Sequence, residues 1–524
     1  MNSNWLIKKL ANQLPKSLSD QFSNSDTLIK SGIILTLLSY KFFPLIAKRL
    51  PFLPTTMKMI NSLAALHKDE KISTLNLNSS DEQCSFYASE DYVFNEVIIG
   101  SGPGGAIAAN LSAKKNHKVL LVEEGRLKSK NDHHSLAQLM FDFRNSGQEV
   151  ILGLPIIPFA QGRVIGGSSE INSGLYHRLP SHVKSEWLSA LNISEKSWHD
   201  AEIAIETALS IDTQNDRSLG VYSKSPLIDA SKRMNWDCQL IPRWRAYSGE
   251  DFIHFGMADT FLRNGNKNIE VLPNHKVFKI FPGEVNHGIE LIGSSCTHRI
   301  KSRKITISCG AVETPRLLAR SKLLKRRDFH FGFHAMSRVL AIFGHSVNDL
   351  KDIDPHQAWT KKFETKFGIS VSTKGFLEAT IKSLDYDIEV DHKKALVFYA
   401  STAMHKRGKF LRLGKEIYPA YYLSKDEIKT IRNSTVMLST GLKKAGALSV
   451  LSNIHKPSLS TVHIFGSLPI GRSPIDSQGT LKNIGYPSIR VCDTSIFPSP
   501  PLVNPQGPLM HLAFVLTEKW LSND

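Results

Sequence analysis

Residues 97–125 read VIIGSGPGGAIAANLSAKKNHKVLLVEEG, and this stretch decides the fold. An apolar run leads into Gly100, Gly102 and Gly105, a small-residue helix follows, and a second apolar run ends at Glu123. This order is typical of a strand–helix–strand unit whose glycine turn lets the backbone approach a pyrophosphate. The free N–H groups at the start of the helix would face the phosphates. The stretch therefore predicts a dinucleotide-binding site.

An acidic residue about twenty positions beyond such glycines can accept hydrogen bonds from ribose hydroxyls, and it disfavours a 2'-phosphate. Glu123 directly follows the second apolar run, so we expect it to have this role. Glu124 is the rival, because a slip of one residue in the strand would exchange the two side chains.

Composition excludes several classes of protein. The chain has 524 residues, of which 41% are hydrophobic and 22% charged, so it is neither disordered, fibrous nor polytopic and has room for two or more domains. The formal charge of +17 could favour nucleic acid, an anionic membrane or an acidic protein. Lysine and arginine are scattered and no nucleic-acid module is visible, so we expect a solvated basic surface and no nucleic-acid partner.

Five cysteines are widely spaced and form no CxxC pair. This pattern favours neither a disulfide framework nor a metal site, and it suits a reducing compartment such as the cytoplasm.

Residues 1–90 precede the first nucleotide-binding strand and form an N-terminal extension. Its most apolar part, 32–53, is interrupted by lysine, arginine and proline, so no run approaches the roughly 18 residues that a bilayer span requires. Two interpretations stay open. The extension packs on the body of the protein as one or two helices, or it lies at a membrane surface with basic residues near the headgroups.

Further motifs follow along the chain. Residues 161–178 read QGRVIGGSSEINSGLYHR, a glycine- and serine-rich loop that can present N–H groups to a phosphate or a planar ring. Residues 304–318 read KITISCGAVETPRLL, a strand, a turn and a helix that begins near a proline. The C-terminal region adds TVHIFGSLPIGR at 461–472, GYPSIRVCDTSIFP at 485–498 and LVNPQGPLMHLA at 502–513.

These motifs, in this order, resemble the glucose-methanol-choline oxidoreductase family of flavoproteins. The resemblance implies an α/β fold in which a discontinuous Rossmann-like FAD-binding domain is joined to a substrate-binding domain with a mostly antiparallel sheet. We expect the FAD-binding domain at 91–180, 265–330 and 460–524, and the substrate-binding domain at 181–264 and 331–459. The sequence HHSL at 133–136 does not resemble a covalent flavin site, so noncovalent FAD is expected.

The resemblance also implies roles for individual residues. His463 matches the catalytic histidine of the family, and Asn504 occupies the second catalytic position, as in members similar to cholesterol oxidase. His177, His334 and His511 have no such support and are expected to be structural. The residues expected to bind FAD are Gly100, Gly102, Gly105, Glu123, Gly166, Gly167, Ser168, Asn172, Val277, Asp493 and Thr494.

Alcohol oxidation needs a base for the hydroxyl proton while a hydride leaves carbon for the flavin. A histidine with an ordinary pKa of about 6.5 suits that proton transfer, and the asparagine can hold the same oxygen. We therefore expect a flavoenzyme that oxidises an alcohol or sugar, with oxygen, a quinone or an acceptor protein taking the electrons. The alternatives are a membrane-associated enzyme for a steroid or lipid alcohol and a degenerate protein that only binds flavin.

Overall fold

The computed structural model describes most of the chain from Tyr92 to Ser522. The N-terminal extension at 1–90 and the HHSL sequence at 133–136 lie outside the described residues, so the predictions about them stay predictions. Within 92–522, the segments also left undescribed are 128–141, 148, 212–224, 249–250, 255, 264–265, 294–296, 349–354, 361–364, 371, 405–407, 456–457 and 472–473.

The first sheet is built on the strand–helix–strand unit. Its main strands run in the order β21-β22-β11-β1-β2-β8, and from β22 to β8 all neighbours are parallel. β9 and β10 extend β11 as an antiparallel hairpin. The strands are β1 (Val93–Ile99), β2 (Val119–Val122), β8 (Ile269–Leu272), β9 (Lys276–Phe281), β10 (His287–Ile292), β11 (Thr297–Ile307), β21 (Thr480–Leu481) and β22 (Tyr486–Val491).

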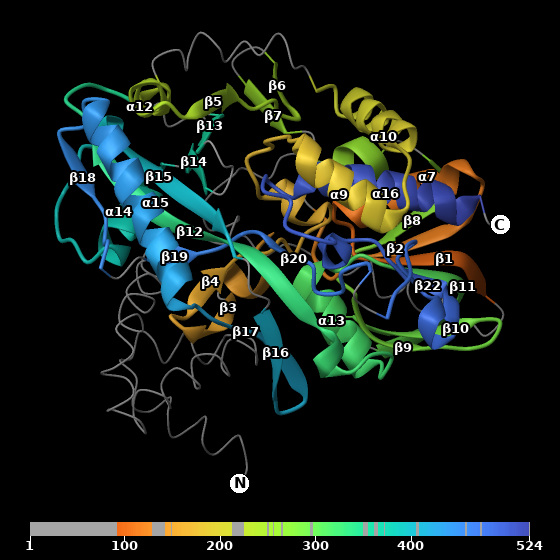
Figure 1. Ribbon diagram of the computed structural model, residues 1–524. Coiled ribbons are helices and arrows are strands. Elements are labelled where there is room, and N and C mark those ends of the chain that lie inside the picture. Colours follow the sequence, from red (N-terminus) through yellow and green to blue (C-terminus); the bar gives the residue numbers. More distant parts are fainter. Residues whose placement is uncertain are drawn as a thin grey trace, which may run out of the picture.

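This sheet is buried because helices cover it. All four residues of β2 are buried, as expected for a central parallel strand. The small residues of α7 (Pro103–Lys114) let it pack closely on the sheet and on α16 (Gln506–Leu521). Segments from opposite ends of the described chain therefore lie side by side (Figure 1).

The second sheet is larger and almost wholly antiparallel, with β3 beside β17 as the parallel pair. Its backbone order is β4-β3-β17-β16-β12-β15-β14-β13-β5, and β18, β19 and β20 pair with β12. The strands are β3 (Glu149–Leu154), β4 (Ile157–Phe159), β5 (Asp237–Leu240), β12 (His330–Ile342), β13 (His356–Trp359), β14 (Thr365–Ile369), β15 (Ala395–Ala403), β16 (Gly408–Leu413), β17 (Glu416–Tyr422), β18 (Ser449–Leu451), β19 (Leu459–Ser460) and β20 (Ile464–Phe465).

Helices lie on both faces of this sheet. Leu438 of α15 (Lys425–Lys444) packs with Val339 on one face, and Leu377 of α14 (Lys374–Ser383) packs with Leu340 on the other. Since neighbouring strand residues point to opposite faces, the even-numbered residues of this part of β12 share their face with α14.

The two sheets confirm the predicted fold class of a Rossmann-like layer joined to a mostly antiparallel one. The layers do not coincide strand for strand with the predicted domains. β3 and β4 belong to the second sheet although they fall within 91–180, and α10 (Glu195–Ala208), within 181–264, packs on α16. The domain boundaries stay a prediction.

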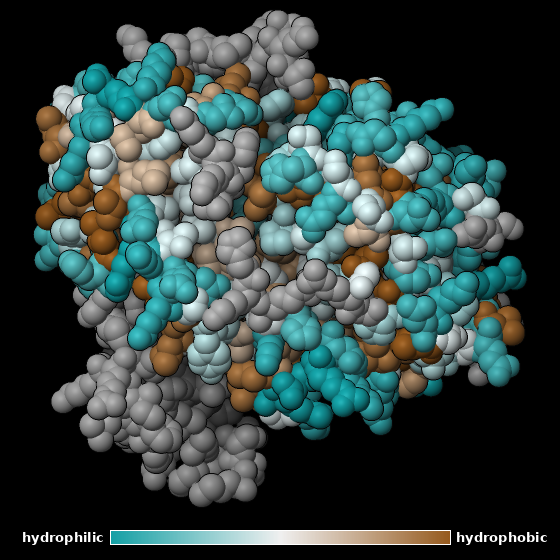
Figure 2. All heavy atoms as spheres, in the orientation of Figure 1, coloured by the Kyte–Doolittle hydropathy of each residue, from teal (hydrophilic) through white to brown (hydrophobic). Residues whose placement is uncertain are grey.

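Much of the surface in view is polar (Figure 2). Figure 2 shows polar side chains over most of the face drawn, with apolar ones in scattered groups. Among the residues that the structure describes, no helix combines the length and apolar character that a bilayer-spanning segment needs.

Candidate active site

A cavity of about 720 Å³ is lined by residues of both sheets, and it gathers most of the predicted site residues. Gly105 and Gly166 are not among its lining residues. Those that line it are Gly100, Gly102, Glu123, Gly167, Ser168, Asn172, Val277, His463, Asp493, Thr494 and Asn504. We call the part around Gly100, Gly102 and Glu123 the glycine end, and the part around His463 and Asn504 the histidine end.

The three glycines of the first turn have different physical reasons to lack a side chain. Gly100 has φ +97°, and a Cβ there would lie 2.3 Å from the Ser308 carbonyl oxygen. A Cβ on Gly105 would lie 1.9 Å from the Gly100 carbonyl oxygen, so this glycine lets helix and strand pack. A Cβ on Gly102 would meet nothing within 4 Å. Its bare backbone faces the cavity, which fits a pyrophosphate that must approach main-chain N–H groups.

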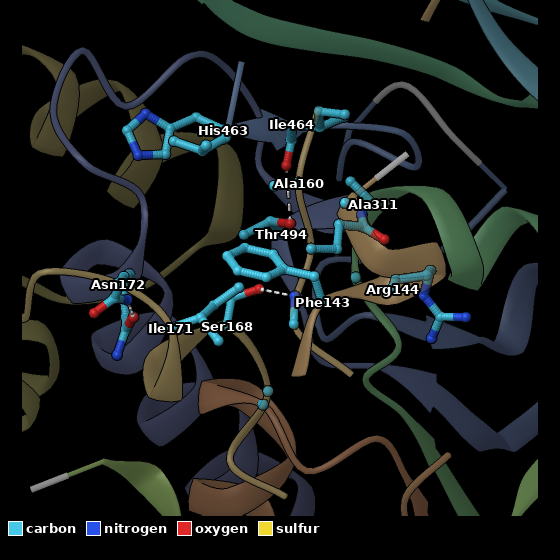
Figure 3. A pocket seen from close by; sticks show the side chains of 18 of the residues that line it. Phe143, Arg144, Ala160, Ser168, Ile171, Asn172, Ala311, His463, Ile464 and Thr494 are labelled. Carbon is cyan, nitrogen blue, oxygen red and sulfur yellow. Dashed lines mark hydrogen bonds between the residues drawn. The ribbon is translucent and has the colours of Figure 1, made fainter. Parts of the chain in front are cut away.

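The second glycine loop lies against the first turn. A Cβ on Gly167 would come 2.8 Å from Cα of Gly102, and Gly167 has φ +61°. The Gly166 backbone N–H donates to Ser101 Oγ at 3.0 Å, which fixes the loop from behind the cavity. Ser168 Oγ accepts from the Gly162 N–H at 2.9 Å (Figure 3).

Glu123 and Glu124 both line the cavity but have different partners. Glu123 accepts from Ser101 Oγ at 2.6 Å, the Ser101 N–H at 3.0 Å and the Gly125 N–H at 2.8 Å. Glu124 instead forms an ion pair with Arg144 at 2.9 Å. Burial alone would raise the pKa of Glu124, but Arg144 and Lys276 outweigh burial and hold it at about 2.

Asp493 lines the cavity while holding two neighbouring segments in place. Its carboxylate accepts from the Gly310 N–H at 2.9 Å and Thr314 Oγ1 at 2.6 Å, both in α13 (Gly310–Arg320). It also accepts from the Ser495 N–H at 2.7 Å. The next residue, Thr494, donates its hydroxyl to the Ile464 carbonyl at 3.1 Å (Figure 3). This bond ties the segment that carries His463 to the first sheet.

Phe143 also lines the cavity, which the sequence did not predict. In Figure 3 its ring is seen between Thr494 and Ser168, while Asn172 lies farther to one side. Asn172 donates to Gln506 Oε1 at 2.5 Å, and so joins the serine-rich loop to the start of α16. An aromatic ring and small polar groups on one cavity wall suit a flat heteroaromatic ligand.

His463 lies against His334, for which we expected only a structural role. The Nδ1 atoms of His463 and His334 are 3.2 Å apart, and the ring planes are nearly perpendicular, at 87°. One of the two Nδ1 atoms must donate to the other. If His463 donates, its Nε2 carries a lone pair, and among the described residues only its Nδ1 takes part in a side-chain hydrogen bond.

The surroundings keep this histidine neutral. Burial first, and then the nearby His334 and Lys366, lower the pKa of His463 well below its usual value. Burial also lowers the pKa of His334 to about 3. A neutral imidazole at physiological pH has one basic nitrogen available to take a proton.

Asn504 is oriented by Lys366, a buried residue of β14 that the sequence analysis missed. The Lys366 ammonium donates to Asn504 Oδ1. Since an ammonium cannot accept, this contact fixes which end of the amide is oxygen. Among the described residues Asn504 is hydrogen-bonded through Oδ1 alone, so its Nδ2 can donate to a molecule in the cavity that it lines.

The sequence has no local signal that assigns a role to Lys366, because its burial becomes visible only in the fold. Lys366 lies in the strand TKFGI, in which all five residues are buried, and a fully buried lysine is rare without a partner. Burial lowers its pKa to about 7. The structure therefore adds a buried lysine, hydrogen-bonded to Asn504, to the two catalytic residues that the sequence predicted, His463 and Asn504.

Comparisons with known proteins identify the family of the chain. Models described as GMC oxidoreductase match residues 104–332 and 403–513. An uncharacterized GMC-type oxidoreductase of Sinorhizobium fredii is 26% identical over 483 residues, which cover 82% of this chain and 94% of that protein. A long-chain-alcohol oxidase of Arabidopsis thaliana is 25% identical over 283 residues, covering 47% of this chain and 36% of that protein.

Two solved structures share the fold. Pyridoxine 4-oxidase from Mesorbium loti has a TM-score of 0.63 at 17% identity and covers 82% of this chain and 99% of its own. Aspergillus oryzae formate oxidase has a TM-score of 0.65 at 13% identity and covers 83% and 99%. The sequence and fold thus agree, and the chain belongs to the glucose-methanol-choline oxidoreductase family of FAD flavoproteins.

Proposed function

We propose that the protein oxidises the CH–OH group of an alcohol to a carbonyl with noncovalently bound FAD, His463 acting as the base. The observation that supports this most is the single cavity lined by both the glycine turn and the His463–Asn504 pair. A cofactor whose phosphates lie at the glycine end would extend its ring system toward the histidine end. The pyrophosphate would fit best beside Gly102, where the main chain has no side chain between it and the cavity.

In this mechanism the two catalytic side chains divide the work on one oxygen. His463 accepts the hydroxyl proton at Nε2, with its Nδ1–H donated to His334. Asn504 donates from Nδ2 to the same oxygen, because Lys366 occupies its Oδ1. FAD, when bound, supplies the hydride acceptor. A positioned base contributes roughly 100- to 10,000-fold to such a step.

A chain-like alcohol is the substrate class that we favour within this function. Apolar side chains line the cavity beyond the histidine end, among them Met336, Ile369, Phe376 and Val462. Similarity to a long-chain-alcohol oxidase of Arabidopsis thaliana points the same way. A steroid or lipid alcohol is thus compatible with the cavity whether or not the extension contacts a membrane.

The experiment is an anaerobic screen of the purified protein. We expect the absorption spectrum of a bound flavin, and we expect alcohols of increasing chain length to bleach it. Oxygen is then admitted, and fast recovery of the colour identifies an oxidase, whereas slow recovery calls for a quinone or acceptor protein. A flavin that no alcohol bleaches would instead favour the degenerate, binding-only alternative.

A further inference from the structure

Arg338 lines the same cavity, and its charge has no carboxylate partner among the described residues. Its Nη1 donates to Ser370 Oγ and its Nη2 to Ser460 Oγ, both at 3.3 Å. Its guanidinium also stacks on Phe376 at 4.8 Å from the ring centre. Two neutral hydroxyls and an aromatic ring leave the positive charge uncompensated, although arginine stays ionised at any physiological pH.

Other arginines with little exposure differ in this respect. Arg144 pairs with Glu124 at 2.9 Å, Arg316 contacts Glu149 at 3.3 Å, and Arg490 lies 3.5 Å from Glu96. Removing a charge from water is strongly unfavourable unless an opposite charge compensates it. A cation placed against a cavity without such a partner therefore indicates that an anion completes the site.

The acids that line the cavity do not fill this role. Glu124 and Glu313 contact Arg144, and Asp493 is bonded to Thr314. Glu123 is held by Ser101. Arg338 forms neither a hydrogen bond nor an ion pair with any of these four acids, and its hydrogen-bond partners are Ser370 and Ser460.

Arg338 is placed on the substrate side of the catalytic pair. His334, which contacts His463, and Arg338 are four residues apart on β12 and share one face of the sheet. Ser460, bonded to Arg338, precedes His463 by three residues. Four residues of strand span roughly 13 Å, so the guanidinium and the catalytic base are on the order of 10 Å apart. Thr373, the N-cap of α14, and Phe376 in its first turn also line the cavity.

We propose that Arg338, with Ser370 and Ser460, binds the carboxylate of a chain-like substrate whose hydroxyl group lies at its other end, beside His463. The proposal rests on the proposed function and names its substrate class. A carboxylate carries one negative charge, which matches one guanidinium, whereas a phosphate monoester carries close to two. The apolar lining between Arg338 and His463 suits the hydrocarbon chain, so ω-hydroxy acids are the compounds expected.

The test compares ω-hydroxydecanoate with decanol, which has the same chain length but no charge. We expect kcat/KM of the full-length holoenzyme to favour the hydroxy acid, and Arg338→Met to lower this preference roughly 10- to 100-fold. Arg338→Lys keeps the positive charge but not the bidentate donor geometry of the guanidinium, so the preference for the hydroxy acid should fall less. A preference that is equal in the wild type and Arg338→Met would overturn the proposal.

Arg320→Met is the matched control. Arg320 lines the same cavity and stacks on Phe278 at 5.3 Å, as Arg338 does on Phe376, but its charge is compensated by Glu416 at 3.2 Å. The preference for the hydroxy acid should therefore survive this substitution. An equal loss in both variants would assign the effect to net charge and refute a specific carboxylate site.

A binding measurement separates this proposal from the proposed function. Decanoate, which cannot be oxidised at a hydroxyl, should raise the unfolding temperature of the wild type more than decanol does, and Arg338→Met should abolish the difference. If decanoate binds through Arg338 but no alcohol bleaches the flavin, the carboxylate site stands and the proposed oxidation fails. If alcohols bleach the flavin and decanoate binds equally to both proteins, the oxidation stands and the carboxylate site fails.

Discussion

The two ends of the cavity are built in opposite ways. At the glycine end, the turn, helix and acid come from one continuous stretch, and the ionised acid Glu124 faces Arg144. At the histidine end, His463, Asn504 and Lys366 come from three distant segments, and the cations Lys366 and Arg338 face no acid among the described residues. At the first end, one sequence segment supplies the turn, the helix and the acid, and the charge of Glu124 is paired. The second depends on tertiary packing and is left with positive charge, which suits the binding of a reactant.

The largest effect should come from His463→Ala. Loss of the base is expected to lower the rate of anaerobic flavin bleaching by roughly 100- to 10,000-fold, while the flavin spectrum is retained because the glycine end is intact. Stopped-flow absorbance measures both. If bleaching stays fast in this variant, another group is the base, and the histidine end has been assigned to the wrong residue.

Lys366 should make stability depend on pH. Its folded pKa of about 7 lies below the ordinary value of about 10.4, so between these values the unfolded chain binds a proton that the folded chain lacks. The free energy of unfolding therefore rises with pH across this window. Below about pH 7 the lysine is charged in both states, and the cost of burying that charge is present in full. Lys366→Met removes that penalty, worth a few kcal/mol. The stability difference between variant and wild type should shrink from pH 7 to pH 10 in urea unfolding, and a constant difference would contradict a buried, titrating lysine.

The orientation of Asn504 can be tested by exchanging its partner. Lys366→Met leaves Asn504 Oδ1 without a donor, and kcat should fall roughly 10- to 100-fold. Lys366→Gln supplies a neutral donor and should recover part of that loss if the lysine acts by orienting the amide. Steady-state kinetics with a saturating alcohol measures kcat. Wild-type rates in both variants would remove Lys366 from the site.

Substitutions at two of the three glycines of the first turn should have different effects. Gly105→Ala places a Cβ 1.9 Å from a carbonyl oxygen and should destabilise the protein itself by about 1–3 kcal/mol. Gly102→Ala meets nothing within 4 Å, so the apoprotein should unfold as the wild type does and lose only FAD affinity. Thermal unfolding with and without added FAD distinguishes the two. Equal FAD affinity in Gly102→Ala would argue against a pyrophosphate at this turn.

The smallest effect concerns the rival acids. Glu123→Gln should weaken FAD binding roughly tenfold, since a carboxylate accepts hydrogen bonds more strongly than an amide. Glu124→Gln should mainly weaken the ion pair with Arg144. Fluorescence titration of apoprotein with FAD gives both affinities. A larger loss in Glu124→Gln would exchange the roles of the two residues.

The glycine end and the fold class could be read from sequence because their signals are local. Strand, turn, helix and acid follow one another within residues 97–125, and each has a distinct pattern. Lys366 and His334 could not be assigned in this way. Their meaning comes from β14 and β12 lying in one sheet, which brings Lys366 to Asn504 and His334 to His463. A lone histidine or lysine in a strand has no periodicity that reports its partner.

The predicted domain boundaries illustrate the same limit. β3 and β4 follow the nucleotide motif in sequence but pair with β17 in the other sheet. Long-range strand pairing has no local sequence signature, so the sheet that each strand joins could not be predicted from chain order.

The position of α16 and β22 has a consequence for how the protein is made. During synthesis, β1, α7 and β2 leave the ribosome long before residues 460–522, which bring β22 to the edge of β11 and α16 onto α7. Until then the apolar flank of α7 has no cover, and His463 and Asn504 do not yet exist in the nascent chain. The lining of the cavity is therefore complete only once this last segment has been made, and the unfinished sheet is the intermediate that a chaperone would have to shield.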